Sequence, residues 1–262
     1  MKDPIYRDDF VTLYQGDSLS LLKELPDHSV DAVVTDPPYS SGGFARSDRN
    51  QKTSSKYVIN GTAVERPEFF GDNRDQRSLL AWCSLWLSEC IRITRPRGYL
   101  LTFTDWRSLP IMTDAVQAGG WVWRGIVPWD KTESARPQMG WFRAQCEYVL
   151  TASNGSMGAE QDRSVKRCLP GLFRGDVKSS EKLHITGKPV WLMSELLNVL
   201  PPGSVILDPF AGSGTTLWSA KQKNMRSIGI EMSREYCEII KNRVLQEVLD
   251  FSEPTLSVEA TA

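Results

Sequence analysis

The 262-residue sequence has no long apolar segment. No hydrophobic run approaches the roughly 20 residues that a membrane-spanning helix needs. The first ten residues are polar and charged, with neither an apolar stretch nor a small-residue cleavage site, so they do not form a secretion signal. We therefore expect a cytoplasmic protein that makes no contact with a membrane.

Cysteine and histidine are too few and too scattered to indicate a structural metal site. The five cysteines are an odd number and include no CxxC pair, and His28 lies far from the second histidine, His184. Structural zinc sites usually draw their ligands from closely spaced pairs of such residues. We therefore expect reduced thiols, as in other cytoplasmic proteins, and no bound metal.

Net charge is also nearly absent, at −1, but the charged residues are unevenly distributed. Residues 40–60 have a net charge of +3 (four bases, one acid), and residues 161–183 also have +3 (six bases, three acids). Residues 244–262 have −4, with four acids and no base. The two basic segments suit a surface that faces phosphates, although solvated loops can carry the same charges.

Short apolar, β-branched runs alternate with helical patterns along the chain. Strands are predicted at residues 11–15, 29–35, 99–104, 123–129, 146–152, 204–207 and 227–230. Helices are predicted at residues 18–25, 78–94, 189–200, 215–223 and 233–249. This alternation is typical of a single α/β domain, here residues 1–262, with helices on both faces of a mostly parallel sheet.

Two segments, residues 40–75 and 153–183, break this alternation and are rich in small and charged residues. Loops of this length inside a compact domain are usually functional or disordered. Residues 250–262 are expected to form a flexible tail.

The most informative segment is residues 33–39, which read Val-Val-Thr-Asp-Pro-Pro-Tyr. An apolar strand ends at Asp36, and ligands of open parallel sheets bind beyond the carboxyl ends of strands. An exocyclic base amine is a poor nucleophile because its lone pair is delocalised into the ring. Asp36 and a carbonyl of Pro37 or Pro38 can accept hydrogen bonds from its two N–H groups, which localises the lone pair on the nitrogen. Tyr39 can stack on a flipped-out base. The alternative is an ordinary Asp-Pro turn after a strand.

A second cluster, residues 205–216, reads as a strand that enters a glycine turn and then a helix. Leu217 replaces the third glycine of the dinucleotide fingerprint, and the lysine of a phosphate-binding loop is also missing. Glu231 ends the next strand about 20 residues later, where an acid suits a ribose diol. Asp17 follows another strand, although a helix cap or a surface charge explains this acid better when it is taken alone. Together these acids favour a nucleoside-type cofactor over a triphosphate.

The two clusters together resemble the β class of amino-methylating DNA methyltransferases, in which a DPPY box precedes an FxGxG box. Residues 36–39 precede residues 210–214 by about 170 positions. A third box, H-x-T-x-K-P, matches residues 184–189, just before the second. The resemblance extends from residue 5 to about residue 249, and three boxes in this order are far more specific than any one alone.

The resemblance implies a Rossmann-like fold for S-adenosylmethionine-dependent methyltransferases, with a seven-stranded, mostly parallel sheet entered in permuted order. It implies catalytic roles at the target base for Asp36, Pro37, Pro38 and Tyr39. It implies S-adenosylmethionine binding by Asp17, Ser18, His184, Thr186, Lys188, Asp208, Phe210, Ala211, Gly212, Gly214 and Glu231.

The resemblance also implies double-stranded DNA as the substrate and a homodimer as the assembly. Because little sequence follows the last predicted helix, we expect DNA recognition from residues 40–75 as an inserted DNA-facing loop, from residues 153–183 as a short target-recognition segment, or from a second subunit. The predicted backbone contacts are Arg46, Lys52, Lys56, Lys166 and Arg167. The apolar helix at residues 79–93 suits either the core or a dimer interface.

Within this family an aspartate at the first box position, here Asp36, goes mostly with N6 of adenine, whereas serine goes mostly with N4 of cytosine. We therefore predict an N6-adenine methyltransferase. N4-cytosine methylation is the alternative, and RNA is a less favoured substrate. From other classes, a DNA-binding protein that keeps the fold without turnover and a nicotinamide-dependent oxidoreductase also stay open.

Overall fold

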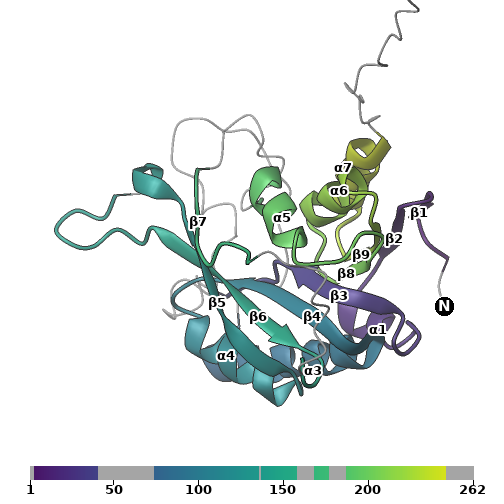
Figure 1. Ribbon diagram of the computed structural model, residues 1–262, viewed down its shortest axis with the longest axis horizontal. Coiled ribbons are helices and arrows are strands. Elements are labelled where there is room, and N and C mark those ends of the chain that lie inside the picture. Colours follow the sequence, from purple (N-terminus) through teal and green to yellow (C-terminus); the bar gives the residue numbers. More distant parts are fainter. Residues whose placement is uncertain (1–2, 41–73, 136, 158–167, 177–186, 246–262) are drawn as a thin grey trace, which may run out of the picture.

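The computed structural model describes residues 3–40, 74–135, 137–157, 168–176 and 187–245. These residues form one open sheet with helices packed on both faces, as Figure 1 shows. The predicted DNA-facing loop at 40–75 lies outside the described residues except at its two ends. The predicted tail at 250–262 lies outside them entirely, and the predicted recognition segment at 153–183 lies partly outside them.

Across the described residues the sheet has nine strands in the order β1-β2-β9-β8-β3-β4-β6-β5-β7. The strands are β1 (Tyr6–Arg7), β2 (Val11–Gln15), β3 (Val30–Thr35), β4 (Thr94–Thr104), β5 (Val122–Asp130), β6 (Cys146–Ser153), β7 (Phe173–Arg174), β8 (Val205–Asp208) and β9 (Arg226–Glu231). Strands β2, β9, β8, β3 and β4 are parallel, and β6 runs antiparallel to both β4 and β5. The mostly parallel, permuted sheet is therefore confirmed.

The predicted count of seven strands was too low by two. The extra strands, β1 and β7, have two residues each and lie at opposite edges of the sheet. A two-residue strand is too short to show the alternation on which strand prediction depends. Strand β7 belongs to the segment that was predicted to recognise the target.

The helices are α1 (Ser18–Leu22), α3 (Gln76–Ile93), α4 (Leu109–Ala118), α5 (Val190–Leu197), α6 (Thr215–Gln222) and α7 (Arg234–Leu245), with a short 3-10 helix, η1 (Thr132–Ser134). Helix α4 was not predicted. Pro110 lies in its first turn, where a missing N–H costs nothing, although a proline in sequence is more readily taken as a break.

Each face of the sheet carries a separate apolar layer. Helices α1, α3 and α4 cover one face around Trp86, Leu100 and Met112, which are fully buried, and helices α5 and α6 cover the other around Leu192 and Ile206. Helix α3 buries the side chains of Leu79, Cys83, Trp86, Leu87, Cys90 and Ile93 along one stripe, so this stripe belongs to the core rather than to a dimer interface.

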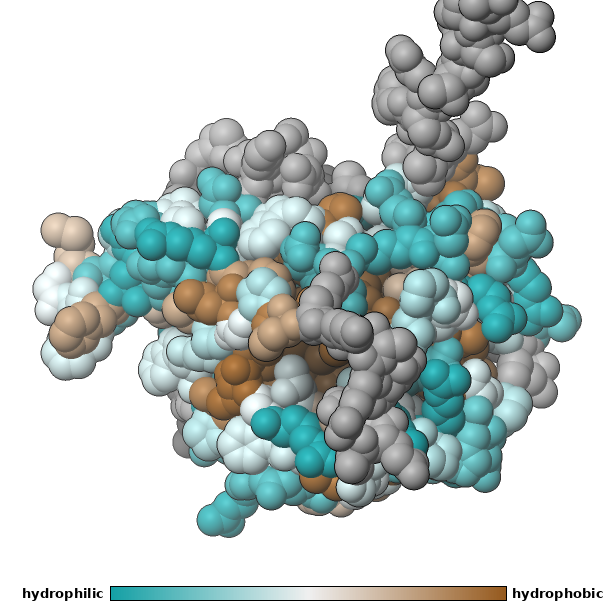
Figure 2. All heavy atoms as spheres, in the orientation of Figure 1, coloured by the Kyte–Doolittle hydropathy of each residue, from teal (hydrophilic) through white to brown (hydrophobic). Residues whose placement is uncertain are grey.

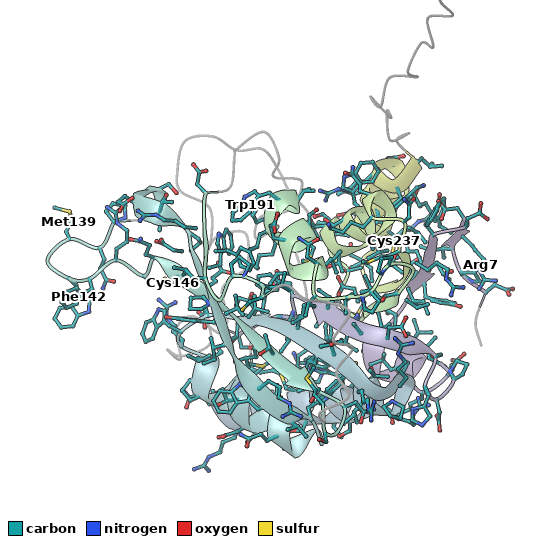
Figure 3. The ribbon with its side chains drawn as sticks, viewed as in Figure 1. Arg7, Met139, Phe142, Cys146, Trp191 and Cys237 are labelled. Atoms are coloured by element: carbon teal, nitrogen blue, oxygen red, sulfur yellow. The ribbon has the colours of Figure 1, made fainter. Side chains whose placement is uncertain are left out.

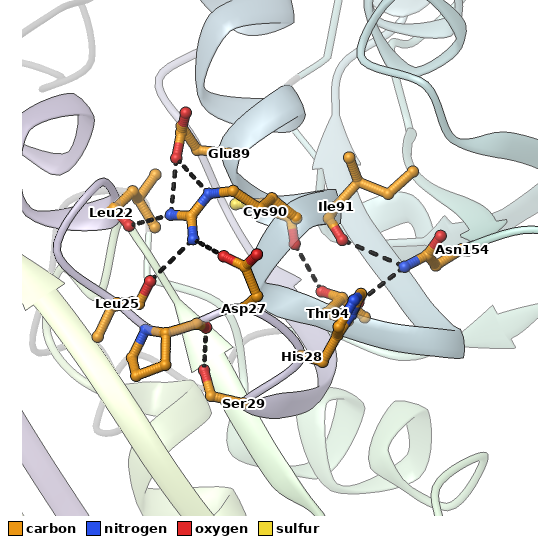
Figure 4. Close-up of polar contacts among 12 residues, drawn as sticks. Leu22, Leu25, Asp27, His28, Ser29, Glu89, Cys90, Ile91, Thr94 and Asn154 are labelled. Atoms are coloured by element: carbon orange, nitrogen blue, oxygen red, sulfur yellow. Dashed lines mark hydrogen bonds and ion pairs between the residues drawn. The ribbon is translucent and has the colours of Figure 1, made fainter.

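The end of helix α3 is fixed to the loop after α1, as the close-up in Figure 4 shows. The Arg92 guanidinium donates to the carbonyl oxygens of Leu22 and Leu25 at 2.9 and 3.0 Å, and Glu89 accepts from it at 2.8 Å. On the other side, the Asn154 amide donates to the Thr94 carbonyl at 2.7 Å. These contacts tie the end of α3 to the loop that precedes β3, and tie the start of β4 to the end of β6.

No helix in the described ranges has both the length and the apolar character needed to cross a membrane. The same residues contain no group of three or more His, Cys, Asp or Glu placed to hold a metal ion. Figure 2 shows apolar side chains gathered near the centre of one face of the molecule, between polar margins.

Candidate active site and cofactor pocket

The candidate site lies at the carboxyl edge of the parallel strands. Asp36 follows β3, Asp208 ends β8, Glu231 ends β9 and Asp17 follows β2. Glu147 reaches the same edge from the opposite direction, because β6 is antiparallel and therefore begins there. All five acids line one cavity of about 570 Å³.

The turn after β3 is held by hydrogen bonds at both ends. Thr35, the last strand residue, is fully buried and donates its hydroxyl to Asp208 at 2.7 Å. The Tyr39 hydroxyl donates to the Asp36 carboxylate, and the Tyr39 carbonyl accepts from Ser108 Oγ at 2.7 Å. Because Pro37 lacks an N–H and has a fixed φ, the carbonyl groups of this turn have little freedom to reorient.

A chain of alternating charges runs from this turn across the cavity. Lys188 Nζ lies 2.5 Å from Asp36 Oδ2 and 3.2 Å from Glu147 Oε2, and Lys131 Nζ lies 3.0 Å from Glu147 Oε1. The Lys188 side chain is only 4% exposed and also faces the rings of Tyr39 and Phe103, at 5.3 and 5.1 Å. Its buried ammonium is therefore shared between two partly exposed carboxylates.

These neighbours shift the pKa values of the charged groups in the cavity. Burial raises the pKa of Asp36, and the nearby Glu147 charge adds to this rise, while Lys188 opposes it. Burial alone would lower the pKa of Lys188, but the two carboxylates raise it above its ordinary value. Burial likewise opposes ionisation of Glu147, yet Lys188 and Lys131 hold its pKa below the usual range. Glu147 is therefore a stable anion at neutral pH.

The glycine turn after β8 forms the opposite wall of the cavity. Glu231 accepts the backbone N–H groups of Gly212 and Ser233 at 2.9 and 2.8 Å, and burial raises its pKa to about 7. Gly214 has φ +78°, and a Cβ there would lie 3.0 Å from Ile240 Cγ1. Only glycine fits this position without strain.

The residues of this wall fit a nucleoside cofactor. The Glu231 carboxylate keeps acceptor capacity beyond its two N–H bonds, as a ribose diol requires. Phe210 offers an aromatic surface, braced by Trp82 and Trp86 with ring centroids 5.3 and 5.2 Å away. Burial raises the pKa of Asp208 to about 6, so it is ionised for the most part at neutral pH.

Twelve predicted site residues line this one cavity: Asp17, Ser18, Asp36, Pro37, Pro38, Tyr39, Lys188, Asp208, Phe210, Ala211, Gly212 and Glu231. Gly214 shapes the turn behind them. Asp17 also caps α1, accepting from Ser20 N at 3.0 Å, and the Ser18 hydroxyl donates to the Pro209 carbonyl at 2.5 Å. The predicted residues that lie outside the described part of the chain are His184, Thr186, Arg46, Lys52, Lys56, Lys166 and Arg167.

Two features of the site were not foreseen from the sequence. Lys188, predicted as a cofactor residue, lines the cavity, and its ammonium also lies against Asp36, 152 positions away in sequence. Glu147 was not among the predicted site residues. Its only signal in the sequence is an acid near the start of an apolar strand, and the direction of that strand is set by the fold.

Comparison with known proteins identifies the family. A model of the DNA methylase family matches residues 30–242, which is most of the chain, and the chain therefore belongs to that family. It is 27% identical over 264 residues to the type II methyltransferase M.HinfI of Haemophilus influenzae, an alignment that covers 93% of this chain and 70% of that protein.

Two solved structures share the fold. M1.HpyAVI in its complex with SAM superposes with a TM-score of 0.63 at 21% identity, covering 90% of this chain and all of the other. The cytosine-N4-specific PvuII DNA methyltransferase superposes with a TM-score of 0.69 at 18% identity, covering 95% of this chain and 91% of the other.

Proposed function

We propose that this DNA methylase transfers a methyl group from S-adenosylmethionine to the N6 amine of adenine in double-stranded DNA. One observation carries the proposal. The same cavity is lined by two features. The Asp36-Pro37-Pro38 turn suits the target amine, and the Glu231 carboxylate, which accepts a hydrogen bond from the Gly212 N–H, suits a nucleoside.

The turn after β3 activates the amine. The Asp36 carboxylate accepts one N–H of the target amine, and a carbonyl of the Pro37-Pro38 pair accepts the other. Two acceptors on these hydrogens favour a tetrahedral nitrogen whose lone pair points away from them. Asp36 also offsets the positive charge that develops on the nitrogen, and the amine loses a proton to solvent after the transfer.

The Tyr39 hydroxyl lies on one oxygen of Asp36, where the incoming amine would compete with it. Burial and the nearby Asp36 charge raise the pKa of Tyr39 well above its ordinary value, so it stays a neutral donor. When the base displaces that hydrogen bond, the ring offers a flat face for stacking.

S-adenosylmethionine, when bound, supplies an electrophilic methyl group on a sulfonium. Glu231 accepts hydrogen bonds from the ribose hydroxyls, and Phe210 packs on the apolar part of the cofactor. The braced Phe210 ring and the left-handed Gly214 turn hold this wall in a fixed shape, so that little ordering is needed on binding.

The segment between η1 and β6 supports a DNA substrate. Met139, Trp141 and Phe142 are 92%, 72% and 82% exposed, and Figure 3 shows Met139 and Phe142 at the tip of a projecting arm. The arm begins at Lys131 and returns at Cys146, and both line the cavity. DNA that delivers a base into the cavity passes close to this arm, and apolar side chains can wedge between base steps.

The family resemblance supports adenine as the base, because Asp36 occupies the first box position, and it also supports a homodimer. The second candidate is N4 of cytosine, since the PvuII enzyme, which is cytosine-N4-specific, shares the fold. Both amines present two N–H groups to the same two acceptors.

Nucleoside mass spectrometry tests the proposal. Unmethylated DNA is incubated with the protein and S-adenosylmethionine, with Asp36→Ala as the matched control. We expect N6-methyladenine from the wild type and none from the variant. N4-methylcytosine would preserve the mechanism and overturn the base assignment, and no methylated base on DNA of varied sequence would refute the proposed function.

A further inference from the structure

The cavity holds a carboxylate, Glu147, that the amine-activating turn does not itself use. It arises from β6 rather than from the parallel strands and shares the Lys188 ammonium with Asp36, at 3.2 and 2.5 Å. The other oxygen of Glu147, Oε1, lies 3.0 Å from Lys131 Nζ. The Lys188 ammonium is buried and lies between two partly exposed carboxylates, so a small movement can bring it closer to either one.

Given the proposed function, on which this inference rests, the position of Lys188 matters to the reaction. During transfer, positive charge moves onto the amine that Asp36 holds. An ammonium fixed on Asp36 would weaken this carboxylate as an acceptor and would repel the developing cation. The free protein nevertheless needs the ammonium, because an uncompensated carboxylate in a largely buried site is costly.

We propose that Glu147 is the alternative partner of Lys188: the ammonium is shared in the free protein and moves onto Glu147 when the target amine reaches Asp36. The full negative charge of Asp36 then faces the amine. Glu147 and Lys188 are thus positioning residues, and Lys131 keeps Glu147 in place to receive the ammonium.

Other ionisable groups surround Asp36 as well. Asp208 at the end of β8 adds negative charge, and Asp105 after β4 is paired with Arg107 at 3.3 Å. The Tyr39 hydroxyl stays neutral. Substitution of Glu147 or Lys188 leaves all of these in place, so a change in the behaviour of Asp36 reports on the substituted group.

The test measures single-turnover methyl transfer against pH at saturating DNA and cofactor. Asp36 must be ionised to accept the amine, so its pKa sets the acid limb of the profile. Glu147→Gln removes a negative neighbour, so the limb moves to lower pH, while the plateau rate falls because Lys188 stays on Asp36. Lys188→Met removes a positive neighbour, so the limb moves to higher pH. Each shift is expected to be about one pH unit, and the plateau loss in Glu147→Gln about tenfold.

The double variant Glu147→Gln/Lys188→Met separates positioning from structure. Without the ammonium, Asp36 is free to face the amine again, so the double variant is expected to be faster than Glu147→Gln alone. A purely structural role for Glu147 predicts a double variant that is no faster. Glu147→Asp keeps the charge and should keep the wild-type limb, and Glu238→Gln, which removes an exposed carboxylate on α7, is the control for charge elsewhere.

The outcomes distinguish this inference from the proposed function. Three results would overturn the inference alone. The acid limbs of Glu147→Gln and Lys188→Met could move in the same direction, or Glu147→Gln could keep the wild-type plateau rate. The double variant could also be no faster than Glu147→Gln. No transfer by the wild type would overturn the proposed function and the inference with it. Cofactor affinity and melting temperature, measured on every variant, show whether a loss of rate reflects a loss of fold.

Discussion

The titration of Glu231 gives the sharpest prediction for the cofactor wall. Burial raises its pKa to about 7, although backbone N–H groups, among them those of Gly212 and Ser233, favour the ionised form. Only the carboxylate has free lone pairs for both hydroxyls of a ribose. Cofactor binding should therefore select the ionised form and weaken as the pH falls below 7.

The expected magnitude follows from the fraction of Glu231 that is ionised. With a pKa of about 7, this fraction is about ten in eleven at pH 8 and about one in eleven at pH 6, so Kd should rise about tenfold, or about 1.4 kcal/mol. Asp208 has a pKa of about 6 and adds to the loss only at the lower end of this range.

Stability without cofactor should change in the opposite sense. The pKa of Glu231 in the folded protein, about 7, lies above the ordinary value of 4.5 that it has in an unfolded chain. The folded protein then binds more protons than the unfolded chain between these values, so this contribution is fully present below 4.5 and is lost as the pH rises through 7. The free energy of unfolding should fall by about 2–3 kcal/mol across that window from this group.

Calorimetric titration with S-adenosylhomocysteine at pH 6, 7 and 8 measures the effect without turnover. Glu231→Gln is the comparison, since the amine of the ligand itself titrates equally in both proteins. A wild-type Kd that does not change between pH 6 and 8, or a change that Glu231→Gln reproduces, would refute the reasoning.

Three further predictions concern the cofactor turn and the arm. Gly214→Ala forces a left-handed residue against Ile240 and should lower the free energy of unfolding by about 1–2 kcal/mol in urea titrations. Phe210→Ala removes two ring contacts and should cost about 1 kcal/mol or more in the same titrations, with weaker cofactor binding by calorimetry. Trp141→Ser with Phe142→Ser should weaken duplex binding in fluorescence anisotropy and leave cofactor affinity unchanged, since both side chains are exposed and away from the core.

Much of the fold could be predicted because its main strands have a recognisable local sequence pattern. Each of the seven longer strands coincides with an apolar, β-branched run, and Asp36, Asp208 and Glu231 were predictable because each lies at the end of such a run. The parallel sheet then brings their side chains to one edge, although they are far apart in sequence.

The parts that could not be predicted depend on long-range geometry. Glu147 joins the site only because β6 runs antiparallel, and sequence alternation does not reveal the direction of a strand. Lys188 lies in a recognisable box, but its contact with Asp36 joins two segments that are distant in sequence. Helix α4 was missed because Pro110 suggests a break, while in the fold it lies in the first turn.

The most direct test of the account is single-turnover methyl transfer by Asp36→Asn, compared with wild type at saturating DNA and cofactor. The variant keeps an acceptor oxygen of the same shape but lacks the charge that draws out the amine lone pair and offsets its cation. We expect the transfer rate to fall about 100-fold or more, with cofactor affinity within about twofold of wild type. A variant that transfers at the wild-type rate would contradict the central claim that the Asp36 carboxylate activates the amine.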